Sequence, residues 1–165
     1  MTQTRKKNKE NIAVAVIQTK KIQGTVIAKK CNKNLTLTAT FTKLPKGKHG
    51  FHIHTAGDLR GEGCKGLCSH YDKGHHEHGG APLKNGLNGN KNRHTGDLGN
   101  IQMKHGKTLK RTFLLSNVNV NDLWGRSIIV HEDEDDLGKG PHEDSKITGH
   151  SGKRIGCAIF GRASC

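Results

Sequence analysis

The chain has 165 residues and a mass of 18.0 kDa, with 28 lysines and arginines against 14 aspartates and glutamates, a formal net charge of +14. This length fits one domain with its own core, and no stretch approaches the roughly 18 apolar residues of a membrane span. The charge is compatible with nucleic acid, an anionic surface or a small anionic substrate, but no zinc finger, glycine-rich phosphate loop or basic zipper accompanies it. Charge alone therefore assigns no partner.

A basic tail and a short apolar run begin the sequence. Basic residues are dense at 5–9, and the apolar run at 12–17 is shorter than the core of a secretory signal peptide. A polar stretch, 18–21, follows it where a signal peptide has a small-residue cleavage site. We therefore expect a disordered basic tail at 1–10, a single domain at 11–165, and a cytoplasmic protein.

Short β-strands are predicted along most of the remaining chain. Residues 35–41 alternate apolar side chains with threonine, which is the period of a half-buried strand, and residues 49–54 alternate again after a turn signal at 45–47. The predicted strands are 12–17, 23–28, 35–41, 49–54, 100–103, 109–115, 127–131 and 155–160. About eight short strands separated by turns indicate an all-β antiparallel sandwich or barrel.

Two long polar segments interrupt the strand pattern. Residues 55–98 contain almost no apolar run but many His, Gly, Lys and Asn residues. Residues 132–153 begin with five consecutive acidic residues and remain polar. Loops of this length in a compact domain are usually functional or disordered, so both segments are candidates for a functional site.

Histidine is the most informative residue type, with twelve in one small domain. His52 and His54 occupy alternate positions of a predicted strand, so both side chains point to the same face. Apposed imidazoles repel each other when protonated, which favours their interpretation as neutral ligands of a cation. The pair alone could equally be the polar outer face of a strand.

The long loop adds enough candidate ligands to favour a metal site. Three imidazoles and one carboxylate complete a tetrahedral zinc shell, and an HxH pair with two further nitrogens suits the tetragonal geometry of copper(II). A further histidine, His131, ends a β-branched run. The loop candidates are His70, His75, His76, His78, His94 and Asp97. The residues alone predict a mainly histidine-ligated site for one or two metal ions.

Five motifs resemble those of copper–zinc superoxide dismutase, in the same order along the chain. They lie at 49–54, 93–100, 130–132, 135–140 and 152–157. The resemblance implies an eight-stranded antiparallel Greek-key sandwich or barrel with two long functional loops, a zinc and disulfide loop and an electrostatic loop. It also implies an enzyme that converts superoxide to oxygen and hydrogen peroxide by cycling of a histidine-ligated copper, with a structural zinc sharing a bridging histidine.

The resemblance also assigns the site residues. The copper ligands fall on His52, His54, His70 and His131, and the zinc ligands fall on His70, His78, His94 and Asp97. His70, the bridging residue, and Arg154, the cation beside copper that orients the anion, are the implied catalytic residues. Asp135 matches the carboxylate that joins a copper histidine to a zinc histidine. His75 and His76 are interpreted as solvated loop residues and His49 as structural.

The resemblance pairs Cys64 with Cys157 in an intrasubunit disulfide that would tie the long loop to the last strand. The other three cysteines, Cys31, Cys68 and Cys165, are expected to be free thiols, as is usual in a reducing compartment.

The sequence departs from the family pattern in two places. The segment between the histidines at 78 and 94 is longer than usual, and residues 83–90 should bulge into solvent without affecting metal binding. Arg162 stands where the family usually has an apolar dimer contact, although Trp124 could supply apolar area instead. We expect a homodimer rather than a monomer. A composition rich in Lys, Asn and Ile indicates an AT-rich genome, such as that of a parasite, a protist or a large DNA virus, and in the viral case the protein would act in the host cytoplasm.

Two other function classes can be weighed against an enzyme. A metal-binding or chaperone module without copper chemistry would be expected to lack copper ligands or the channel arginine, and this chain keeps all of them. A nucleic-acid-binding protein is suggested only by charge, so nucleic-acid binding beyond weak charge effects is not expected.

Overall fold

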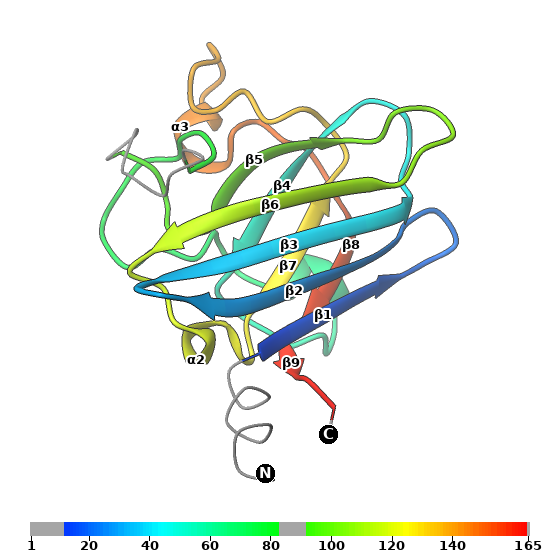
Figure 1. Ribbon diagram of the computed structural model, residues 1–165. Coiled ribbons are helices and arrows are strands. Elements are labelled where there is room, and N and C mark those ends of the chain that lie inside the picture. The colour runs from blue at the N-terminus through cyan, green and yellow to red at the C-terminus, as the bar shows by residue number, and fades with distance from the viewer. Residues whose placement is uncertain (1–11, 83–91, 165) are drawn as a thin grey trace, which may run out of the picture.

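The computed structural model describes residues 12–82 and 92–164 (Figure 1). The predicted tail at 1–10, the inserted segment at 83–90 and Cys165 lie outside the described residues. Within the described residues, nine strands form two antiparallel sheets, and three short helical turns lie in the connections. None of the helices in this part of the chain has the length and apolar character needed to span a bilayer.

The two sheets have the strand orders β6-β3-β2-β1-β9 and β5-β4-β7-β8. The strands are β1 (Ile12–Gln18), β2 (Gln23–Cys31), β3 (Asn34–Lys43), β4 (Lys48–His54), β5 (Asp97–Gln102), β6 (Leu109–Ser116), β7 (Ser127–His131), β8 (Arg154–Ile159) and β9 (Gly161–Arg162). The helical turns are η1 (Gly63–Gly66), α2 (Val120–Leu123) and α3 (Ser145–Thr148). All eight predicted strands are present.

The connections have Greek-key topology. β6 returns to lie antiparallel beside β3 after the chain has formed β4 and β5 in the other sheet. The expected antiparallel Greek-key sandwich is therefore confirmed, with one difference in strand number. After the buried Phe160, the two residues of β9 pair with β1, so the end of the chain passes from the edge of one sheet to the edge of the other.

The core lies between the sheets, where every second residue of a strand points inward. In β3 the buried positions are Leu35, Leu37, Ala39 and Phe41, and the three residues between them are threonines at the half-exposed outer face. Phe41 packs edge-on against Phe51 of β4, with ring centroids 5.9 Å apart and an interplanar angle of 79°. This aromatic pair joins one sheet to the other.

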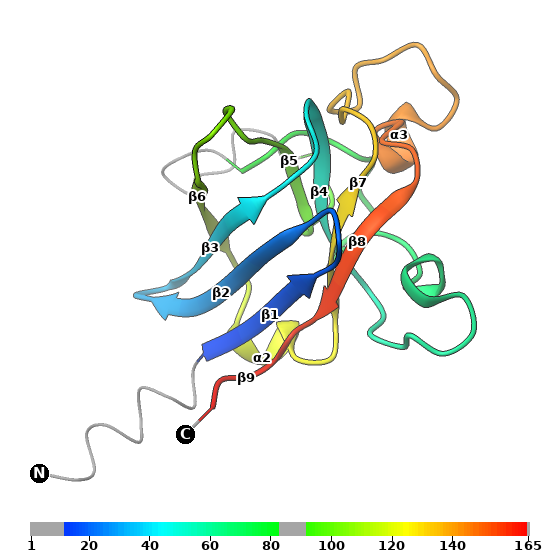
Figure 2. The ribbon, with the colours of Figure 1, turned by 90° about the vertical axis from the view of Figure 1, so that its right-hand side faces the viewer.

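Two long loops cover the second sheet. The 55–96 loop joins β4 to β5 and the 132–153 loop joins β7 to β8. In Figure 2, residues 55–75 and the 132–153 loop lie beside the second sheet, on the side that faces away from the first. Each loop also forms a backbone hydrogen bond to β4: Gly50 N to Asp133 O at 2.9 Å, and Tyr71 N to Ile53 O at 2.8 Å. The loops therefore meet over the strand that carries the HxH pair.

Candidate metal centre

Four buried histidines form one group beneath the two loops. His52 and His54 lie on β4, His131 ends β7, and His70 comes from the 55–96 loop, where it pairs with His54 as an isolated bridge. Each is at most 6% exposed, and their candidate ligand atoms all lie within 4.8 Å of one another. These are the four residues that the resemblance assigned to copper.

Each of these four rings has one hydrogen-bonded nitrogen and one buried nitrogen without a hydrogen-bond partner. The unpartnered atoms are His52 Nδ1, His54 Nε2, His70 Nε2 and His131 Nε2. The other ring nitrogens contact Asp135 Oδ2, Cys68 O, Asp97 Oδ1 and Gly152 O, at 2.8, 2.9, 2.8 and 3.3 Å respectively. Buried polar atoms are nearly always bonded, and a neutral imidazole that donates through one nitrogen has a lone pair on the other. The group therefore fits a bound cation, and imidazole suits copper.

A second group shares His70 with the first. It consists of His70, His78, His94 and Asp97. Asp97 Oδ1 lies 2.8 Å from His70 Nδ1, 3.1 Å from His78 Nδ1 and 3.3 Å from His94 Nδ1. Ligand atoms of a tetrahedral zinc ion with bonds of about 2.0 Å are about 3.3 Å apart, so three histidines and one carboxylate at these distances fit zinc.

The environment keeps the four-histidine group neutral. Burial, followed by the neighbouring His70 and His131, holds the pKa of His52 well below its usual value, and burial likewise lowers the pKa of His54. Burial lowers the pKa of His131 to about 4. Neutral imidazole is the form that binds metal, so these three residues can bind a metal ion at neutral pH without first losing a proton.

The carboxylate of the second group, Asp97, has a lowered pKa although it is buried. Burial alone would raise the pKa of Asp97, but hydrogen bonds from His70, His78 and His94 hold it well below its usual value. Its other oxygen, Oδ2, accepts backbone N–H groups from Gly79 at 3.0 Å and His94 at 2.8 Å. Asp97 is thus an ionised carboxylate with a fixed orientation.

Asp135 connects the two groups. Its Oδ2 accepts from His52 Nε2 at 2.8 Å, and its Oδ1 accepts from His78 Nε2 at 2.7 Å and from the backbone N–H of Leu137 at 2.8 Å. The side chain of Asn100 on β5 fixes the backbone of Asp135. Its Oδ1 accepts from the N–H of Asp135 at 2.7 Å, and its Nδ2 donates to the carbonyl of Asp135 at 2.8 Å. Asn100 has no predicted role, because nothing in the sequence besides its place in a motif indicates this contact.

Arg154 lies at the start of β8 and donates hydrogen bonds to the 55–96 loop. Its Nη1 donates to the carbonyls of Cys64 and Lys65 at 3.1 and 2.8 Å, and its Nη2 donates to the carbonyl of Cys68 at 2.6 Å. The same Cys68 carbonyl accepts from His54 Nδ1. Cys68 is predicted only as a free thiol, because a contact through the backbone carbonyl leaves no signal in the sequence.

The predicted disulfide between Cys64 and Cys157 is present. It links the 55–96 loop to β8 across a sequence separation of 93 residues, three residues from Arg154. Cys31 and Cys68 are exposed free thiols, as expected.

The remaining predicted histidines lie outside both groups. His75 is exposed and His76 is exposed beside Asp72, 3.0 Å from Nδ1 to Oδ1. His49 is buried, with Nδ1 2.9 Å from the carbonyl of His131 and Nε2 3.2 Å from that of Pro45, so its bonds are to backbone.

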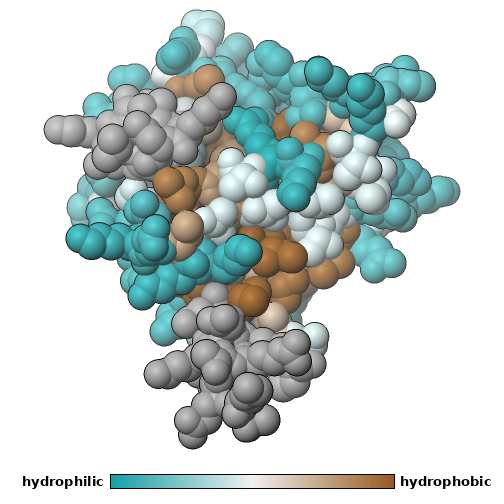
Figure 3. All heavy atoms as spheres, in the orientation of Figure 1, coloured by the Kyte–Doolittle hydropathy of each residue, from teal (hydrophilic) through white to brown (hydrophobic). Residues whose placement is uncertain are grey.

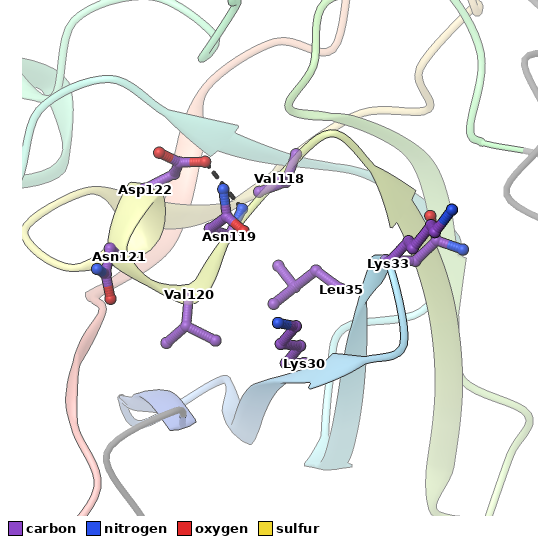
Figure 4. A pocket seen from close by; sticks show the side chains of 9 residues that line it. Lys30, Lys33, Leu35, Val118, Asn119, Val120, Asn121 and Asp122 are labelled. Atoms are coloured by element: carbon purple, nitrogen blue, oxygen red, sulfur yellow. Dashed lines mark hydrogen bonds between the residues drawn. The ribbon is translucent and has the colours of Figure 1, made fainter.

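A cavity of about 350 Å³ lies elsewhere, between the β2–β3 turn and α2 (Figure 4). Its lining includes the apolar residues Leu35, Val118 and Val120 together with Lys30 and Lys33. It contains none of the predicted site residues.

Comparison with known proteins agrees with this geometry. The family model of copper/zinc superoxide dismutase (SODC) matches residues 22–160. A superoxide dismutase [Cu-Zn] of Paramecium bursaria Chlorella virus 1 is 39% identical over 155 residues, covering 92% of this chain and 78% of the relative. Superoxide dismutase [Cu-Zn] 5 of Dictyostelium discoideum is 38% identical over 154 residues, covering 90% and 95%.

Two further matches extend the comparison. The extracellular superoxide dismutase [Cu-Zn] of Drosophila melanogaster is 38% identical over 134 residues, covering 79% of this chain and 70% of the relative. The crystal structure of the clock protein EA4 superposes with a TM-score of 0.83 at 32% identity, covering 94% of this chain and 96% of that one. With the family model spanning most of the sequence and these identities over most of both chains, this protein belongs to the copper/zinc superoxide dismutase family.

Proposed function

We propose that this chain carries out the superoxide dismutation of its family at the two side-chain groups described above. Copper would be held by His52, His54, His70 and His131, and zinc by His70, His78, His94 and Asp97. The observation that carries the assignment is the set of four buried ring nitrogens, one on each copper candidate, that have no hydrogen-bond partner.

The side chains divide the work between binding, orientation and proton transfer. When bound, copper supplies one-electron exchange with superoxide, and zinc, which has no redox chemistry, supplies fixed positive charge. His70 has Nδ1 fixed against Asp97, so its Nε2 is the atom that would hold a proton destined for the peroxide product. Asp135 would keep the rings of His52 and His78 oriented.

Arg154 would attract and orient the superoxide anion. Its Nη2 and His54 Nδ1 both bond the carbonyl of Cys68, so the guanidinium lies beside the four-histidine group. We expect Arg154→Ala to lower kcat/KM about 10- to 100-fold at low ionic strength and to flatten the decline of rate with added salt. Stopped-flow or pulse-radiolysis rates over a salt series measure both effects.

Arg60→Ala is the matched control for this experiment. Arg60 belongs to the same loop, but its side chain is 91% exposed and pairs with Asp58. It should leave both the rate and its salt dependence within about twofold of the parent protein. Equal rates and salt slopes for the Arg154 variant and the parent would refute the steering role.

We further propose a homodimer formed by the outer face of β1 and its neighbours. The guanidinium of Arg162 on β9 lies 3.8 Å from the ring centroid of Trp124, so the arginine presents a stacked surface rather than an isolated charge. Val16 and Ile27 are 55% and 42% exposed, and apolar atoms gather over β1 and β2 in Figure 3. Sedimentation velocity at micromolar concentration should give a dimer that Trp124→Glu dissociates. A monomeric parent protein would contradict this.

We also propose that the protein is a single domain, residues 11–165, that acts in the cytoplasm, or in the host cytoplasm if the source is viral. The support for the location is the pair of exposed free thiols, Cys31 and Cys68, which suit a reducing compartment. Subcellular fractionation with an antibody tests it, and recovery in the secreted fraction would contradict it.

A further inference from the structure

The end of α3 lies directly against the hydrogen bond between Asp135 and His78. Gly149 caps α3 in the left-handed conformation, with φ of 70°, and its N–H donates to the carbonyl of Ser145. A Cβ built on Gly149 would overlap Asp135 Oδ1 and His78 Nε2, the two atoms that form that hydrogen bond. No side chain can therefore occupy this position while the bond keeps its present geometry.

The backbone around α3 fixes the glycine in this place. The carbonyl of Gly149 accepts from the N–H of Asp136 at 2.9 Å, and the carbonyl of Lys146 in α3 accepts from the N–H of His78 at 2.8 Å. The same short helix thus contacts the residue after Asp135 and the backbone of His78. It joins the 132–153 loop to the 55–96 loop beside Asp135, whose carboxylate bonds one histidine of each metal group.

We propose that Gly149 is a positioning residue. Because it has no side chain, its backbone can pack directly against the Asp135–His78 hydrogen bond, which shields that bond from water and keeps the Asp135 carboxylate between His52 and His78. This inference rests on the roles of Asp135 and His78 proposed above. A hydrogen bond shielded from water keeps its direction and strength, and partners of this kind usually change metal affinity about 10- to 100-fold when lost. We therefore expect Gly149→Ala to weaken zinc binding by that factor.

The chain offers a matched control for the backbone effect of alanine. Gly106 has φ of 68°, almost the same as Gly149, and a Cβ there would have nothing within 4 Å. Gly106→Ala and Gly149→Ala therefore introduce alanine into the same unfavourable conformation, and only the second fills the space beside Asp135. Any excess effect of the second variant belongs to the contact.

The test uses parent protein and both variants loaded with zinc and copper(I), a diamagnetic form suited to NMR. In Gly149→Ala the ring Nε2–H resonance of His78 should move, and zinc should be lost to a chelator at about 10- to 100-fold lower chelator concentration. The ring N–H of His54, bonded to Cys68, should stay in place in the same sample. Gly106→Ala should match the parent protein in every respect.

Two results would overturn the proposal: parent-like zinc retention and His78 resonance in Gly149→Ala, or equal changes in Gly106→Ala. If Gly149→Ala does not fold, adding Asp135→Ser should restore folding, because the shorter side chain removes the carboxylate and lets the His78 ring tilt away. Failure to restore folding also overturns the proposal.

Asp135→Ser by itself separates the role of Asp135 from the role of Gly149. Normal zinc affinity in that variant would reject the role of Asp135, whereas weakened affinity with a parent-like Gly149→Ala rejects only the role of Gly149.

Discussion

Replacing His131 by alanine should abolish copper binding and superoxide dismutation while leaving zinc in place. His131 is 3% exposed and offers Nε2, one of the four unpartnered nitrogens of the copper group. It belongs to no part of the zinc group. Loss of an outer partner of a ligand costs about 10- to 100-fold in affinity or activity, so loss of a ligand should cost more than about 100-fold in dismutation rate.

His75→Ala is the control, because His75 is an exposed histidine of the 55–96 loop that lies outside both groups. Copper and zinc contents by plasma mass spectrometry and dismutation rates should be those of the parent protein. Parent-like copper content and rate in the His131 variant would reject the copper site, and a parallel loss of zinc would reject the division of the residues into two groups.

The strands and the histidine pair on β4 could be predicted from the sequence, because both depend on the alternation of neighbouring residues. Alternation of apolar residues with threonine marks β3, and the same period of two brings His52 and His54 to one face. Strand pairing adds His131, since β7 lies beside β4. The strands and the HxH pair need only the geometry of a strand, whereas the assignment of His131 to copper came from the family resemblance, because the pairing of β4 with β7 is a long-range contact.

The loop residues could not be placed in this way. Among the loop histidines, nothing local distinguishes His78, which is buried in the zinc group, from His75 and His76, which are exposed. That choice came from family resemblance. The difference arises from distant contacts: the backbone of His78 is held by α3, and its ring by Asp135.

Removing the disulfide by Cys64→Ser with Cys157→Ser should lower the free energy of unfolding by several kcal/mol. The bond closes a loop with a sequence separation of 93 residues. The chain-entropy relation for such a loop gives about 4–5 kcal/mol, or a fall in Tm of roughly 10–15 °C for a domain of this size. Calorimetry of the metal-free proteins measures it without the added stability of bound metal.

The same variant should also weaken the hydrogen bonds between Arg154 and the 55–96 loop. Arg154 bonds the carbonyl of Cys64 itself, so the disulfide and the guanidinium hold the same segment. We expect kcat/KM of the metal-loaded variant to fall, with a weaker salt dependence than in the parent protein. Cys31→Ser, at an exposed free thiol, should change the unfolding free energy by no more than about 0.5 kcal/mol. A double-serine variant that melts with the parent protein would mean that the loop is held by its hydrogen bonds alone.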